Sequence, residues 1–131
     1  MRSRCLLSLL FVGSVCLQAI AAEHTTDSLD EVKKNLAAEK AVLLDVREPS
    51  EWEDGHLKDA KLLSLSKVRK GVPAEDLAKL MPRGKVVYAH CAAGVRCLEV
   101  ADRLKPLGYE IRPLKPGYKD LLKAGFPKAE P

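Results

Sequence analysis

The stretch KVVYAHCAAGVRCLEV, residues 85–100, joins an apolar run to a helix-like pattern through a short loop. Residues 85–90 are mostly apolar and predict a buried strand, and residues 96–107 repeat apolar side chains at helical intervals. Gly108 follows as a C-terminal cap, so Pro106 falls near the end of this helix, where proline is tolerated. Cys91 therefore lies just past the carboxyl end of a strand, the edge where α/β sheets bind ligands.

Outward from this stretch, the apolar pattern alternates between strand and helix periods. Ser28 and Glu31 have the spacing of a capping box, Pro49 can occupy the first turn of a short helix, and Gly55 can end it. The pattern predicts helices at 28–39, 50–54, 73–81 and 117–125, and strands at 41–46, 60–65 and 109–114. This alternation indicates an α/β fold with a central parallel sheet of about four to five strands and helices on both faces.

The first 21 residues have the layout of a secretory signal peptide. Arg2 and Arg4 precede an apolar run, and Ala19 and Ala21 form an A-x-A site. Cleavage near Ala21 or Ala22 is expected to leave a single domain over residues 22–131, exported to the periplasm or the extracellular space. The apolar run is shorter than the roughly 20 residues of a spanning helix, so membrane attachment is expected only in the alternative that the signal stays uncleaved.

Composition restricts the functional classes. The net charge is +4 and falls to +2 when the two arginines of the signal leave. With one Trp, three Tyr and two Phe, this mildly basic chain lacks the footprint of a nucleic-acid-binding protein. Cys5 and Cys16 leave with the signal, so Cys91 and Cys97 alone remain, too few for a disulfide scaffold.

The loop after residue 90 has the composition of an anion cradle. Ala92, Ala93, Gly94 and Val95 are small or compact, which lets their amide N–H groups converge on one point. The helix N-terminus adds N–H groups and a partial positive charge, and Arg96 adds a full one. A thiol at the centre should ionise well below the free-cysteine pKa of about 8.5. The alternative is a buried, inert core thiol, which would suit a cysteine inside the strand better than one after it.

Three segments match motifs of a known family and occur in the same order along the chain: LLDVREPSEWEDGHLKDAKLL (43–63), CAAGVR (91–96) and LKPGYKDLLKAGFP (114–127). On these motifs the chain resembles the single-domain rhodaneses, a sulfurtransferase family, over nearly all of residues 28–127. The resemblance implies a rhodanese-like fold and the transfer of a sulfane sulfur. A single match to the C-x-x-G-x-R motif would be weak evidence for the family, but three motifs in the same order and at the same spacing are specific evidence.

The resemblance also implies residue roles. Cys91 corresponds to the nucleophile that accepts the sulfur as a persulfide, residues 92–96 to the cradle whose amides hold it, and Arg96 to an anion contact. Trp52 and the acidic residues beside it are expected to be packing and solvated surface. Four residues near the site are implied to be architectural rather than chemical: Asp45, Arg47, Gly55 and His56.

Some positions depart from the family pattern. Asp59, Pro116 and Leu121 replace residues usual in the family without touching the cradle. Arg96 is the only charged residue of the loop, which puts thiosulfate in question as the natural donor. The loop from Cys91 to Arg96 has the length found in sulfur-transferring members, one residue shorter than in related phosphatases and arsenate reductases. Phosphoryl transfer, which needs more donors for its charged oxygens, is therefore disfavoured.

Cys97 has two interpretations. It can be a small apolar residue in the first helical turn, facing the sheet, or a resolving thiol that attacks a Cys91 persulfide or closes a disulfide with Cys91. His90 together with the two thiols could form a soft-metal site, but its side chain should alternate away from that of Cys91. No metal is expected.

The sequence thus predicts a sulfurtransferase that works through a Cys91 persulfide, without a cofactor. The expected partners are a small sulfur-containing anion such as thiosulfate as donor and a thiol or cyanide as acceptor. Two alternatives stay open: a non-catalytic persulfide-carrying or protein-binding module, and a Cys91/Cys97 thiol redox protein. The sequence does not indicate an oligomeric state.

Overall fold

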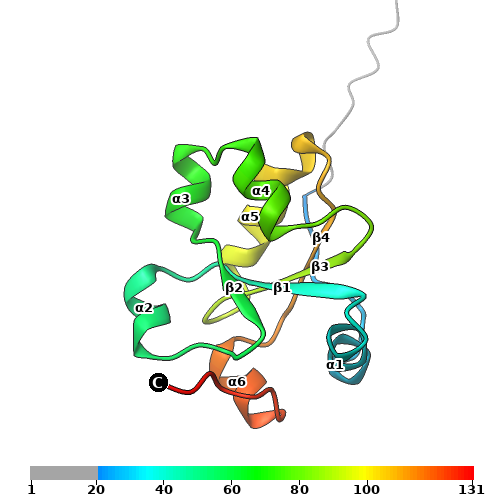
Figure 1. Ribbon diagram of the computed structural model, residues 1–131, viewed down its shortest axis with the longest axis vertical. Helices are drawn as coiled ribbons and strands as arrows, with labels where there is room; N and C mark the ends of the chain where they lie inside the picture. Colours follow the sequence, from blue (N-terminus) through cyan, green and yellow to red (C-terminus); the bar gives the residue numbers. More distant parts are fainter. Residues whose placement is uncertain (1–20) are drawn as a thin grey trace, which may run out of the picture.

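The computed structural model describes residues 21–131, and the predicted signal peptide lies almost entirely outside them. These residues form one parallel sheet of four strands in the order β2-β1-β3-β4 (Figure 1). The strands are β1 (Ala41–Asp45), β2 (Ala60–Leu62), β3 (Val86–His90) and β4 (Ile111–Pro113). Within residues 21–131, no helix is long and apolar enough to cross a membrane.

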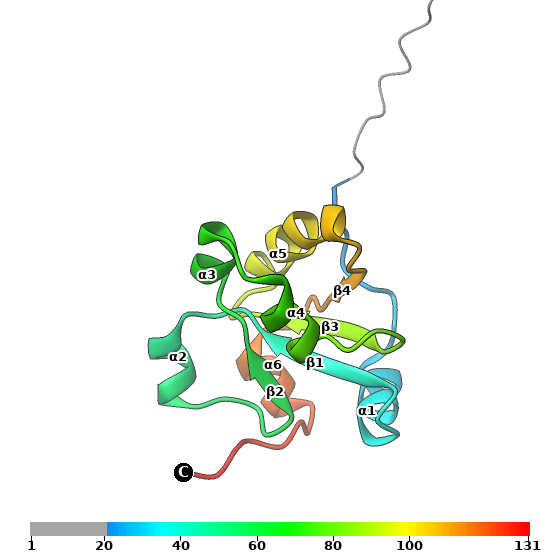
Figure 2. The same cartoon turned by 45° about the horizontal axis from the view of Figure 1, so that its top comes forward.

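Helices cover both faces of this sheet (Figures 1 and 2). One face carries α3 (Leu65–Lys70), α4 (Ala74–Leu80) and α5 (Arg96–Leu104), and the other carries α1 (Leu29–Ala37) and α6 (Tyr118–Lys123). The short α2 (Pro49–Asp54) follows β1 at the carboxyl edge of the sheet, and a 3-10 turn (Lys105–Leu107) follows α5. The predicted α/β fold with a parallel sheet and helices on both faces is confirmed.

Two apolar clusters stabilise the two layers, because successive strand side chains point to opposite faces. Val42 and Leu44 pack with residues of α3, α4 and α5. Ala41, Leu43 and Tyr88 pack on the other side, with residues of α1 and α6. β1 is buried along its whole length, which explains its unbroken apolar sequence.

The expected strand at 60–65 was partly wrong. β2 ends at Leu62, and a helix that the pattern did not predict, α3, begins at Leu65. The Ser64 hydroxyl accepts a hydrogen bond from the Lys67 amide (3.3 Å) and caps this helix. Leu63 and Leu65 are buried beside the sheet, so the apolar run marks burial in the core rather than continued strand.

A buried tyrosine of the central strand anchors the N-terminal segment. Tyr88 is fully buried, and its hydroxyl donates to the Asp27 carboxylate (2.7 Å) and accepts from the Asn35 side-chain amide (3.0 Å). Arg112 of β4 pairs with the same carboxylate at 2.8 Å. Burial and the neighbouring carboxylate raise the pKa of Tyr88, so the phenol stays neutral and serves as the donor.

Replacing Tyr88 with phenylalanine should therefore lower the free energy of unfolding by about 1–2 kcal/mol, because two polar partners lose their hydrogen bond. Denaturant titration of the protein measures this loss. Tyr109→Phe is the matched control, since the Tyr109 hydroxyl has no hydrogen-bond partner within residues 21–131 and its ring is also buried. Equal losses in the two variants would contradict the anchoring role of Tyr88.

Candidate active site

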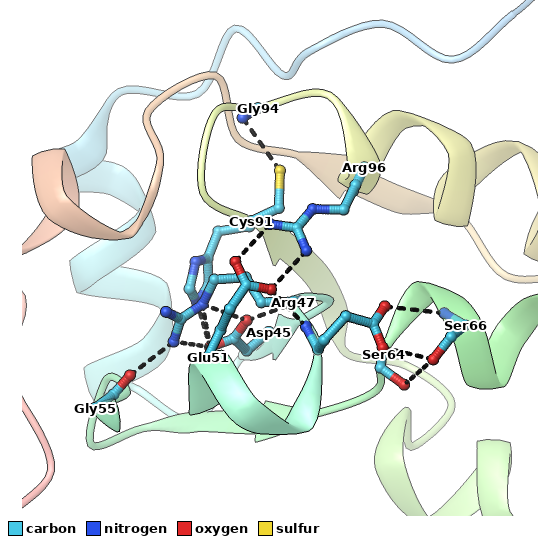
Figure 3. Close-up of polar contacts among 11 residues, drawn as sticks. Asp45, Arg47, Glu51, Gly55, Ser64, Ser66, Cys91, Gly94 and Arg96 are labelled. Atoms are coloured by element: carbon cyan, nitrogen blue, oxygen red, sulfur yellow. Dashed lines mark hydrogen bonds and ion pairs between the residues drawn. The ribbon is translucent and has the colours of Figure 1, made fainter. Parts of the chain in front are cut away.

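The candidate site lies where the two central strands end. β1 and β3 pair in parallel with Asp45 opposite His90, so the segments that follow them leave the sheet side by side. Cys91 comes directly after β3, and residues 91–95 lead into α5. The site is thus assembled at the carboxyl edge of the sheet from the β3–α5 loop and the segment around α2 (Figure 3).

The sulfur of Cys91 accepts a hydrogen bond from its own loop. The Gly94 amide donates to Cys91 Sγ at 3.1 Å, as Figure 3 shows. Hydrogen bonds from the Cys97 thiol and from the amides of Cys97, Ala93 and Gly94 outweigh the effect of burial and lower the pKa of Cys91 to about 4. Cys91 is therefore a thiolate at neutral pH.

This thiolate lies beneath its own loop. Cys91 is 1% exposed and packs with the core cluster on the α3–α5 side, so the sulfur does not project into solvent. The exposed residues of the loop are Ala92, Ala93 and Val95, which we call the rim; Val95 is 69% exposed. Burial, which usually indicates an inert thiol, here coexists with ionisation because the donors replace water.

Cys97 faces into the loop. Its thiol lies 3.4 Å from the Gly94 carbonyl oxygen and 3.5 Å from that of Leu114, either of which can accept its proton. Both cysteines are free. Interaction with the neighbouring Cys91 sulfur, together with burial, raises the pKa of Cys97, so Cys97 stays protonated.

Two neighbouring segments hold the loop through Gly94. This residue has φ of +79°, and a Cβ at this position would lie 2.5 Å from the Lys115 carbonyl oxygen. The left-handed backbone and the close approach both require glycine. On the other side, His24 Nε2 donates to the Gly94 carbonyl at 2.6 Å, which ties the N-terminal segment to the loop.

The segment after β4 packs against the loop equally closely. A Cβ on Gly117 would lie 1.8 Å from the Ala92 carbonyl oxygen, so only glycine fits there. The Tyr118 amide donates to the Cys91 carbonyl at 2.9 Å. The substitution of Pro116 for a usual glycine is accommodated, because Gly117 is the residue in contact with the loop.

A buried ion pair lies beside the loop. Arg47 binds Asp45 through Nε and Nη2 (2.8–3.1 Å) and donates to the Gly55 carbonyl at 2.8 Å. Its guanidinium also stacks over the Tyr118 ring, 4.0 Å from the centroid. The pair thus connects β1, the end of α2 and the start of α6, and no donor of this pair reaches the Cys91 sulfur.

Two further histidines near the site, His56 and His90, have different surroundings. His56 stacks on Trp52 with ring centroids 3.6 Å apart, and its Nδ1 lies 3.0 Å from the Trp52 carbonyl oxygen. His90 is fully buried, 3.6 Å from Asp45 Oδ2, and burial lowers its pKa, so it is neutral. In the described part of the chain, no cluster of His, Cys, Asp and Glu side chains is suited to a metal ion.

Arg96, which the resemblance implied to be an anion contact, is instead paired with a carboxylate of the protein. Its Nη1 and Nη2 bind the two carboxylate oxygens of Glu51 at 2.6 and 2.8 Å (Figure 3). Glu51, expected as solvated surface beside Trp52, is thus half-buried against the loop. The sequence contained one signal for this contact: Glu51 lies in the first turn of a helix that follows β1, next to the loop that follows β3.

Comparisons with known proteins agree with this geometry. The family model of the rhodanese-like domain matches residues 28–124. YqhL of Bacillus subtilis, described as uncharacterized, is 38% identical over 112 residues, which cover 83% of this chain and 82% of YqhL. The probable adenylyltransferase/sulfurtransferase MoeZ of Mycobacterium tuberculosis is 35% identical over 101 residues, which cover 76% of this chain and 25% of MoeZ.

Among solved structures, the human single-domain sulfurtransferase TSTD1 is similar with a TM-score of 0.61 and 25% identity, covering 75% of this chain and 95% of TSTD1. The chain spans only about a quarter of MoeZ but 82% of YqhL and 95% of TSTD1 in these matches. A family match over most of the described residues, together with these relatives, shows that the chain belongs to the rhodanese-like domain family.

Proposed function

We propose that this protein is a sulfurtransferase that carries a sulfane sulfur on Cys91. The observation that carries the proposal is the Gly94 amide hydrogen bond to Cys91 Sγ, in a loop whose donors lower the pKa of Cys91, because a thiolate is the nucleophile in sulfur exchange. The names of MoeZ and TSTD1 describe sulfur transfer in relatives of this domain, which supports the same general chemistry here.

The reaction proceeds in two displacement steps. The Cys91 thiolate attacks the sulfane sulfur of a donor, a new S–S bond forms, and the donor's own bond to that sulfur breaks with its electron pair leaving on the departing group. The product is a Cys91 persulfide anion. An acceptor thiolate or cyanide then attacks the outer sulfur, and Cys91 leaves again as a thiolate, so the protein needs no external oxidant or reductant.

The hydrogen-bond donors of the loop stabilise a different anion before and after the transfer. In the resting protein the amides of Ala93, Gly94 and Cys97 stabilise the thiolate, and after transfer the same group of donors can stabilise the persulfide anion. The Cys97 thiol adds one donor and remains protonated. This arrangement favours Cys97 as a positioning residue over a resolving thiol, since attack on a persulfide requires a deprotonated sulfur.

We also propose that the domain is exported after removal of its first 21 residues. The arginines, apolar run and A-x-A site support this proposal. The geometry at the start of the described chain is compatible with it, because the Ala22 backbone nitrogen lies 2.7 Å from Asp102 Oδ1. Cleavage after Ala21 would turn this nitrogen into a charged amino group beside a carboxylate.

The proposed reaction predicts a stable sulfur adduct. Incubation with thiosulfate should increase the intact mass of the protein by one sulfur atom, and cyanide should remove it. Cys91→Ser should show no gain, because it lacks the nucleophile. Multiple turnovers with thiosulfate and cyanide distinguish an enzyme from a carrier, which would load once and stop. A sulfur gain in the Cys91→Ser variant would contradict the proposed site.

The ionisation of Cys91 predicts a specific pH dependence. Since the pKa is lowered to about 4, the ultraviolet absorbance of the thiolate should persist from neutral pH into mild acid and disappear with a midpoint near pH 4. Cys97→Ala should raise this midpoint because one donor is lost, and Cys97→Ser, which keeps a donor, should restore most of it. If both Cys97 variants titrate like wild type, Cys97 does not stabilise the thiolate.

The export proposal predicts a defined N-terminus. When the whole chain is expressed in a secreting host, N-terminal sequencing of protein recovered outside the cytoplasm should begin at Ala22. Ala21→Leu places a large side chain at the cleavage site and should block or shift processing, because this position requires a small residue. Recovery of the full-length chain inside the cells, with no processed product, would contradict export.

A further inference from the structure

The pairing of Glu51 with Arg96 removes the one free positive charge from the proposed sulfur-transfer loop. The two side chains form a bidentate ion pair and are 34% and 29% exposed, so the charges are partly shielded from water. Hydrogen bonding to Arg96 lowers the pKa of Glu51 to about 2, and Glu51 is therefore an anion at neutral pH. The loop presents a neutral pair rather than a cation.

Glu51 is fixed in this position by its own helix. Its carboxylate also accepts a hydrogen bond from the Glu48 amide at 2.8 Å, which closes the first turn of α2. The Glu48 carboxylate in turn binds the Ser66 hydroxyl at 2.6 Å, at the start of α3 (Figure 3). Glu51 and Ser66 both lie on packed helices, so these contacts hold the Glu51 carboxylate in place. Arg96 can therefore reach a ligand only by breaking its pair with Glu51.

The rim beside the pair has no side chain that could bind a doubly charged ligand. The rim consists of the exposed side chains of Ala92, Ala93 and Val95, which carry no charge and no hydrogen-bonding group. The nearby guanidinium of Arg47 is buried and bound to Asp45. Neither the rim, the Arg96–Glu51 pair nor Arg47 offers a free cation to a dianion that approaches the Glu51 carboxylate and loses water on the way.

We propose that Glu51 is a specificity-determining residue, which disfavours dianionic sulfur donors such as thiosulfate. The donor class that fits is an organic sulfane compound, a persulfide R–S–SH or a thiosulfonate R–SO₂–S⁻, with at most one charge and an apolar group that contacts the rim. This inference rests on the proposed function, since it concerns the donor of that reaction. With a thiosulfonate, attack by Cys91 on the outer sulfur yields the Cys91 persulfide and releases the sulfinate R–SO₂⁻.

The test compares two donors that differ by one charge. The kcat/KM for loading Cys91 is measured with thiosulfate and with benzenethiosulfonate, in wild type and in Glu51→Gln. The glutamine keeps an oxygen that can accept from the Glu48 amide but removes the negative charge. The ratio of thiosulfate to benzenethiosulfonate should rise about tenfold, the scale of one additional charge interaction in a partly exposed site.

Glu53→Gln is the matched control. Glu53 lies on the same helix, is exposed, and has no ion-pair partner among the described residues, so this variant makes the same charge change away from the loop. Its donor ratio should stay within about twofold of wild type. In Glu51→Gln, the gain for thiosulfate should also decrease with added salt and disappear when Arg96→Gln is combined with it, because the freed guanidinium attracts the dianion.

The outcomes separate this inference from the proposed function. If neither donor adds sulfur to Cys91 in any variant, the proposed function fails. If both donors load and Glu51→Gln leaves their ratio unchanged, or slows both equally, Glu51 does not select by charge and this inference alone fails. A thiosulfate gain that persists in the Glu51→Gln, Arg96→Gln double variant also contradicts it.

Discussion

The geometry of the site depends on the close contact between the β3–α5 loop and the segment that follows β4. A side-chain carbon on Gly94 would lie 2.5 Å from the Lys115 carbonyl, and one on Gly117 would lie 1.8 Å from the Ala92 carbonyl. Backbones approach this closely only where side chains are absent. Pressed together in this way, and with Gly94 in a left-handed conformation, the loop turns its amides inward toward the Cys91 sulfur rather than outward to water.

Ionisation and burial of the same sulfur follow from that arrangement. A thiolate transferred from water into the core cluster would normally become protonated, because a low dielectric disfavours charge. Here the Cys97 thiol and the amides of Ala93, Gly94 and Cys97 replace the lost water, and the pKa of Cys91 falls to about 4. The same hydrogen bonds therefore stabilise the loop and keep the Cys91 sulfur reactive. The site is organised before any sulfur donor binds.

The buried charges next to the loop support its surroundings in a different way. Arg47 joins Asp45, the Gly55 carbonyl and the Tyr118 ring, so it holds the segments on both sides of the loop. Arg96 is bound from outside by Glu51 of α2. Each of these two arginines is paired with a carboxylate, and hydrogen bonds supply the favourable electrostatics at the sulfur. This distribution of charge is the basis for a site that discriminates among donors.

The sequence by itself determined the α/β class, the succession of strands and helices outside residues 60–70, and the place of Cys91 at a strand end. These properties are local, because the period of apolar residues and a few caps suffice to specify them. Only the tertiary structure decided that residues 65–70 form a helix, that Cys97 faces Cys91 and that Glu51 binds Arg96. The contact between Glu51 and Arg96 joins segments 45 residues apart, and it arises because β1 and β3 are neighbours in the sheet. No local sequence pattern specifies that these two strands lie next to each other, because their arrangement depends on the packing of the whole domain.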